Sequence, residues 1–139
     1  SGEMIMRNIS TFAAIAFVAA GTFVASSAFA IEVQLDKEIA AAASHAGYAA
    51  AAGDIDGVRA HLHHTINCLA GPAGKGFDAK QMNPCAALGN GAIADASDKG
   101  TIMALEAAQA SAEDAVAESD LAKAQAGATA VQSMLSSIE

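Results

Sequence analysis

The chain has 139 residues, a formal net charge of −8 at pH 7 and a hydrophobic content of 53%. This length is enough for one domain, and the acidic balance argues against nucleic acids and anionic membranes as partners, while metal cations or basic proteins stay compatible with it. There is no Trp and one Tyr, so a core must be built from aliphatic side chains. Such a core is thin, and a disulfide, a metal or a dimer interface would help to stabilise it.

The first 30 residues have the pattern of an export signal. A short segment with one positive charge, Met4–Asn8, precedes an apolar run over 11–24 and the small-x-small pattern Ala28-Phe29-Ala30, which signal peptidases accept. Ser1–Glu3 then look like residues added ahead of the initiator. The alternative is a transmembrane anchor, but the apolar run is shorter than the ~20 residues of a bilayer span and no basic cluster follows it.

We therefore expect two parts, a signal peptide over 1–30 and a single helical domain over 31–139. Cleavage before Ile31 would release a periplasmic or secreted protein that does not contact the membrane. In such a compartment the only two cysteines, Cys68 and Cys85, are expected to form a disulfide, which closes a loop of ~17 residues and contributes ~2–4 kcal/mol. Thiolate metal ligands are the alternative, whereas a thiol oxidoreductase is disfavoured because the spacing is not Cys-x-x-Cys.

Residues 32–52 and 54–70 are predicted to form a helical hairpin. Both are rich in helix-forming residues and carry apolar positions at helical spacing. Gly53 interrupts the pattern, Asp54 is a good N-cap for the second helix, and Gly71-Pro72 is a strong stop. The positions expected to be buried are Leu35, Ile39, Ala42, Ala46, Ala49, Ile55, Val58, Leu62, Ile66 and Leu69.

Residues 71–100 read as a long loop with six glycines and two prolines, in which Phe77, Met82 and Ile93 are the side chains best able to hold it to the core. Two more helices follow, over 101–118 and 120–137. Their expected buried positions are Met103, Leu105, Ala108, Ala112, Val116, Leu121, Ala124, Ala128, Val131 and Leu135. The predicted fold is all-α, a four-helix bundle made of two helical hairpins with a long Gly-rich, disulfide-stapled loop between them.

Histidines are confined to the first hairpin. His45 lies eight residues before Gly53 and His61 eight residues after it, so at ~1.5 Å rise per residue both sit about 12 Å from the turn, level with each other. His64 follows His61 by three residues, which places it on the same flank one turn further on. His63 falls on the other flank of the helix. The spacing therefore predicts that His45, His61 and His64 converge.

Three imidazoles from two neighbouring helices suit a late first-row divalent ion, namely copper, nickel or zinc. His63, Asp54, Asp56 or a water molecule are candidates to complete the coordination. Two alternatives stay open: solubilising histidines at the boundary of a small helical protein, and haem b bound between histidines of the bundle. Covalent haem is excluded because there is no Cys-x-x-Cys-His motif, and no phosphate loop, dinucleotide fingerprint or pair of catalytic carboxylates predicts an enzyme.

Part of the first hairpin resembles a known family. Ala-Ser-His45-Ala, the alanines after it, Gly53-Asp54 and Val58-Arg59-Ala60-His61 are similar to the small metal-binding proteins of bacterial periplasms, over about residues 39–69. The resemblance implies an exported, histidine-bearing helical bundle that binds copper and other divalent ions. Family members carry more histidines and lack the segment from Asn67 to Cys85, a difference that favours one defined site.

The sequence thus predicts an exported protein that binds one divalent transition metal and is not an enzyme. The competing prediction is a structural or interaction module of the cell envelope, in which the region from Asp54 to Cys85 docks a partner protein or a second copy of the chain.

Overall fold

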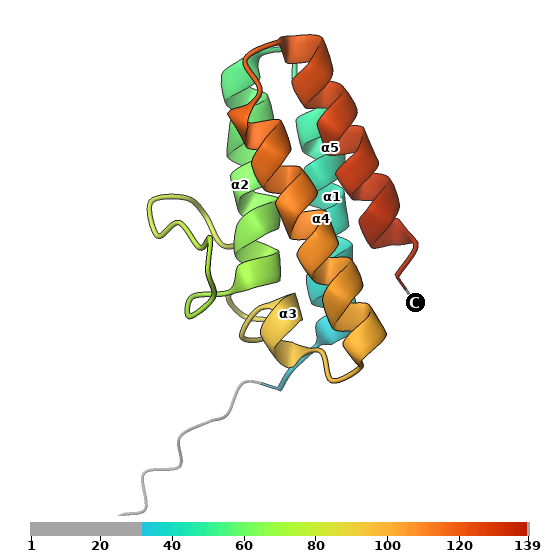
Figure 1. Cartoon of the computed structure of the whole chain (residues 1–139). Helices are drawn as coiled ribbons and strands as arrows, with labels where there is room; N and C mark the ends of the chain where they lie inside the picture. Colours follow the sequence, from blue (N-terminus) through green and yellow to red (C-terminus); the bar gives the residue numbers. More distant parts are fainter. Residues whose placement is uncertain (1–31, 139) are drawn as a thin grey trace, which may run out of the picture.

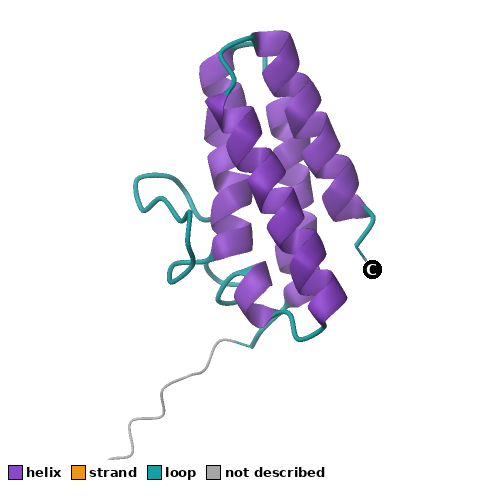
Figure 2. Cartoon of the chain, in the orientation of Figure 1, coloured by secondary structure: helices purple, strands orange, loops and turns teal. Residues whose placement is uncertain are grey.

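In a computed structural model of the protein, residues 32–138 are described, and they form five α-helices with no strand among them (Figures 1 and 2). The prediction of an all-α protein is therefore confirmed. None of the helices in this range combines the length and the apolar character needed to cross a membrane. The predicted signal peptide over 1–30 and its cleavage point before Ile31 lie outside the described residues.

Four of the helices are long and lie alongside one another, and the fifth is a single turn. α1 packs against α2 and α5, α4 packs against the same two helices, and the short α3 lies at one end (Figure 1). The predicted bounds of the long helices agree with the structure to within three residues. The helices are α1 Leu35–Ala51, α2 Ile55–Ala70, α3 Ala92–Asp95, α4 Lys99–Ala117 and α5 Leu121–Ser136.

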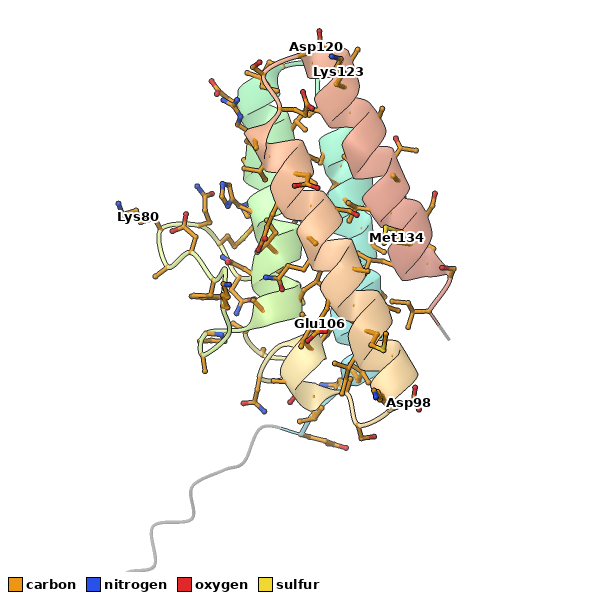
Figure 3. All side chains as sticks on the ribbon, viewed as in Figure 1. Lys80, Asp98, Glu106, Asp120, Lys123 and Met134 are labelled. Atoms are coloured by element: carbon orange, nitrogen blue, oxygen red, sulfur yellow. A yellow bond between two sulfur atoms is a disulfide. The ribbon has the colours of Figure 1, made fainter. Side chains whose placement is uncertain are left out.

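Aspartates begin three of the long helices. The side chains of Asp54, Asp98 and Asp120 each accept a hydrogen bond from the backbone N–H three residues further on, at 2.7 to 2.9 Å. This is the ordinary N-cap arrangement, which satisfies one of the free N–H groups of a first turn. Asp98 and Asp120 lie at opposite ends of the helical assembly (Figure 3), so α4 and α5 run in opposite directions.

The core consists mostly of alanine and leucine, as the scarcity of aromatic residues requires. Ala42, Ala46 and Ala49 of α1 have no exposed surface, and small side chains at these positions let neighbouring helices approach closely. Gly47 of α1 lies against the end of the Gln132 side chain of α5, whose Nε2 would be 2.6 Å from a Cβ atom at Gly47.

Six of the positions predicted to be buried are not fully buried in the structure. The prediction for Met103 is wrong, because this side chain is 60% exposed; it lies one residue off the stripe of α4 that faces the neighbouring helices. The other five are partly buried, since they lie near helix ends or at the edges of the buried stripes: Leu35, Ile39, Ile55, Val116 and Leu121.

The segment between α2 and α4 is more ordered than a plain loop. It contains α3, which was not predicted, and Cys85 joins it to Cys68 of α2 in the predicted disulfide. Asn67 also holds the segment, because its Nδ2 donates to the carbonyls of residues 78, 81 and 82 and its Oδ1 accepts from the backbone N–H of residue 78. The prediction that Met82 anchors the segment is wrong, since that side chain is 56% exposed. Lys80 projects from the outer edge of the same segment (Figure 3).

Candidate metal centre

The structure brings together the three histidines whose convergence was predicted. One nitrogen atom of each of His45, His61 and His64 lies within 4.8 Å of the corresponding atoms of the other two. The ring centroids are 5.7 Å apart for His45 and His61, 5.2 Å for His45 and His64, and 5.5 Å for His61 and His64. α1 supplies one ring and α2 supplies two, so the cluster lies across the seam of the hairpin.

Close packing of α1 on α2 holds the rings at this separation. Thr65, the residue after His64, is fully buried, and its Oγ1 donates a 3.0 Å hydrogen bond to the Ala42 carbonyl of α1. Ala42 lies three residues before His45 on the same helix, so the inter-helix bond fixes the register one turn below the cluster. The short turn between Ala51 and Ile55 fixes the register above it.

The Nδ1 atoms of all three rings are buried and have no hydrogen-bond partner. A buried nitrogen without a partner loses its hydration without replacement, at a cost of about 1–3 kcal/mol. Three such atoms in one cluster are unusual, because buried polar groups in proteins are normally paired. A bound cation would satisfy them, since an unprotonated imidazole nitrogen offers a lone pair.

The electrostatics of the cluster favour unprotonated rings. Burial lowers the pKa of His45 below its ordinary value of 6.5, and the neighbouring His64 and His61 lower it further. Burial likewise lowers the pKa of His64, with added contributions from His61 and His63. At neutral pH these two imidazoles are therefore neutral, which is the state that coordinates metals.

Tyr48 is a neighbour of the cluster that the sequence analysis missed. Its ring lies 5.3 Å from His45 and 5.6 Å from His61, measured between centroids, while 56% of the residue is exposed. The sequence held a signal for it, since Tyr48 follows His45 by three residues and such pairs share a helix face. Because the chain has one Tyr and no Trp, the emission of Tyr48 reports on this cluster alone.

The other predicted ligands do not join the three histidines. His63 is half-buried and stays outside the group of nitrogens within 4.8 Å. Asp54 caps α2, and Asp56 is exposed in the first turn of the same helix; neither is part of the cluster. The alternative of thiolate ligands is wrong, because Cys68 and Cys85 are bonded to each other.

A metal ion would need a small movement of the rings. Zinc–nitrogen distances of ~2.0–2.1 Å place two coordinating nitrogens about 3.4 Å apart in a tetrahedral site. The nitrogens of the cluster lie within 4.8 Å of one another, so movements that close these gaps by up to about 1.4 Å would bring them to the coordinating distance.

Comparisons of the chain with protein-family models, with curated proteins and with solved structures found no match. The resemblance of residues 39–69 to small periplasmic metal-binding proteins therefore stays a prediction.

Proposed function

We propose that the protein binds one divalent transition metal ion through His45, His61 and His64. The observation that carries this proposal is the convergence of one nitrogen from each of three rings, each of which also has a buried Nδ1 without a hydrogen-bond partner. Each ring contributes a nitrogen donor, and a set of three such donors suits copper, nickel or zinc better than calcium or magnesium, which prefer oxygen. Water supplies the remaining coordination.

Haem b fits the site less well than a single ion. A porphyrin coordinated by two histidines must lie between them, and here α1 and α2 are in direct contact through the Thr65–Ala42 hydrogen bond next to the cluster. The third histidine would also have no role in such a site. The chain has only one tyrosine near the cluster and few aromatic side chains elsewhere to cover a macrocycle.

We also propose the setting in which the site works. The four long helices are interpreted as a four-helix bundle of two hairpins, in which the disulfide staples the segment between them. The signal pattern over 1–30 and the cysteine pair favour a periplasmic or secreted protein without catalytic activity. A structural or interaction module of the cell envelope is the competing function, and a homodimer is one form that it could take.

The proposal is tested by the stability of the purified protein with Zn(II), Ni(II) and Cu(II). At pH 7 an ion at 100 times its dissociation constant should raise the free energy of unfolding by about 2.7 kcal/mol. At pH 5 the gain should disappear because the imidazoles become protonated. Cu(II) should also quench the emission of Tyr48 with the same saturation point, since the phenol ring contacts two of the ligands.

The matched variants are His61→Ala and His63→Ala, which remove neighbouring histidines of the same helix. His61→Ala should abolish the stabilisation and the quenching, whereas His63→Ala should leave both. An interaction module would show no stabilisation with any of the three ions, and a non-specific metal effect would respond equally to the two variants.

A further inference from the structure

Glu38 is a buried carboxyl group that the proposed metal centre does not use. It lies in the first turn of α1, seven residues before His45, and has no exposed surface. Its Oε1 accepts a 3.1 Å hydrogen bond from the backbone N–H of Gly91, but its Oε2 is buried without a partner. A carboxylate in this position would leave a charge and a lone acceptor in the interior, which is costly.

The second carboxyl group beside it is that of Asp95 in α3. Both side chains crowd the α-carbon of Gly89, where a Cβ atom would clash with Asp95 Oδ2 and lie 2.6 Å from Glu38 Oε1. Asp95 is itself held in place, because its Oδ2 accepts from the Asn90 backbone N–H at 2.6 Å and its Oδ1 from the Asn90 side chain at 3.0 Å. Asp95 is thus fixed as an acceptor, and it lies beside a carboxyl group of which one oxygen lacks a partner.

No cation balances this pair in the described part of the chain. Burial raises the pKa of Glu38 to about 7, the Gly91 hydrogen bond opposes the rise, and the charge and hydrogen bond of Asp95 add to it. Asp95 is the charged side chain that acts on Glu38 here. Two uncharged groups also lie against Glu38: Cys85 Sγ is 3.6 Å from its carbonyl oxygen, and the Gly91 amide bonds its Oε1.

We propose that the Glu38 carboxyl group holds a proton that it donates to Asp95, and that this shared proton latches the α3 segment, residues 86–98, onto α1 in a pH-dependent way. With the proton, Glu38 is neutral, and its carboxyl group both accepts from the Gly91 amide and donates to Asp95. Without the proton, the carboxylates of Glu38 and Asp95 are two negative charges in a buried site. Because water stabilises both charges, their repulsion favours separation of the α3 segment from α1.

The consequence is a segment whose attachment weakens as the pH rises toward neutrality while the long helices stay folded. Between the ordinary carboxyl pKa of 4.5 and the raised pKa of about 7, opening releases one proton, so each pH unit favours the open state about tenfold. Above about pH 7 both states have lost this proton, and the balance between them stays constant. Opening would also expose the disulfide, because Cys85 is only 1% exposed and packs on the Glu38 backbone. The latch is independent of the histidine cluster, which lies two turns further along α1.

Hydrogen exchange of the full protein tests the latch from pH 5 to 9. After correction for intrinsic rates, the protection of the Gly91 and Ala96 amides should fall about tenfold per pH unit between pH 5 and pH 7 and then stay constant, while Val131 in α5 should stay protected throughout. Glu38→Gln is the matched variant, since its amide can accept from Gly91 and donate to Asp95 at every pH. Its Gly91 and Ala96 protection should not depend on pH.

A second measurement reads the proton directly and does not depend on the variant. Infrared difference spectra of the wild-type protein should show the carbonyl band of a protonated carboxyl group at pH 6, lost on titration through about pH 7. The proposal is overturned if that band is absent at pH 6. It is also overturned if the protection of the wild type does not depend on pH, or if Glu38→Gln loses as much protection as the wild type. If adding Ca(II) at pH 8 restored the protection, the proposal would also be overturned. The carboxyl groups of Glu38 and Asp95 would then bind a metal ion and would not share a proton.

Discussion

His45 of α1 and His64 of α2 face each other edge to face, with their ring planes at 83° and their centroids 5.2 Å apart. The contact joins two helices that also pack along a buried seam and share the Thr65–Ala42 hydrogen bond. A metal ion bound between these rings would therefore cross-link the hairpin, so its binding free energy would add directly to the stability of the fold.

The same contact makes the metal-free protein sensitive to acid. The pKa values of His45 and His64 are lowered in the folded state, so the unfolded chain binds protons more tightly. Their contribution to stability is present above pH 6.5 and is lost as the pH falls through the lowered pKa values. Urea unfolding between pH 7.5 and pH 5 should show this loss. The variant with both His45→Gln and His64→Gln should lose less stability over that range, and an equal loss in the two proteins would contradict the assignment.

Glu38 should produce a pH dependence of opposite sign. Its pKa in the folded protein is about 7, above the ordinary value of 4.5, so the folded state holds the proton more tightly. The stability it supports is complete below pH 4.5, falls as the pH rises through about 7 and is then constant, a total change of about 3 kcal/mol. Glu38→Gln should remove this slope and unfold at higher urea than the wild type at pH 8. A wild type that is the more stable of the two at pH 8 would contradict this account.

The histidine cluster could be predicted from sequence because it depends on local geometry. The distances of His45 and His61 from Gly53, with the rise of a helix, are enough to place them level across a hairpin. Glu38 could not be found in this way. It occupies a helix position where an acidic residue is ordinarily exposed, and it is buried only because Gly89, Gly91 and α3 return over it from fifty residues away. The single turn of α3 gives too short a pattern to be recognised, and it too depends on those contacts.

Asn67 should be the side chain that matters most for the segment after α2. It makes four hydrogen bonds to the backbone of residues 78–82 and is fully buried. Asn67→Ala should lower the free energy of unfolding by about 3 kcal/mol, at roughly 0.5–1.5 kcal/mol for each bond. Asn83→Ala, which removes one hydrogen bond to the Cys85 amide, should cost about 1 kcal/mol. Chemical denaturation measures both losses. If the two variants lost the same free energy of unfolding, Asn67 would not be the anchor of the segment.

Two glycines should respond in opposite ways to alanine. Gly71 has φ = 67°, and a Cβ atom there would clash with the backbone carbonyl of Asn90, so Gly71→Ala should destabilise the protein by more than about 2 kcal/mol. A Cβ atom on Gly53 meets nothing within 4 Å. Gly53→Ala should therefore change the stability by less than about 1 kcal/mol, in the stabilising direction, since it restricts the unfolded chain. Thermal unfolding of both variants checks the contrast, and a tolerated Gly71→Ala would contradict the close approach of the two chain segments.

The metal proposal is tested most directly by the imidazole nitrogen signals of the protein during a titration with Zn(II) at pH 7. Long-range ¹H–¹⁵N spectra resolve the ring nitrogens of each histidine. The account predicts that the rings of His45, His61 and His64 shift together and stop changing at one equivalent, while those of His63 keep their metal-free positions. Three results would contradict the proposed site. All four rings could respond alike, His63 could respond in place of one of the three, or no ring could show a saturating change.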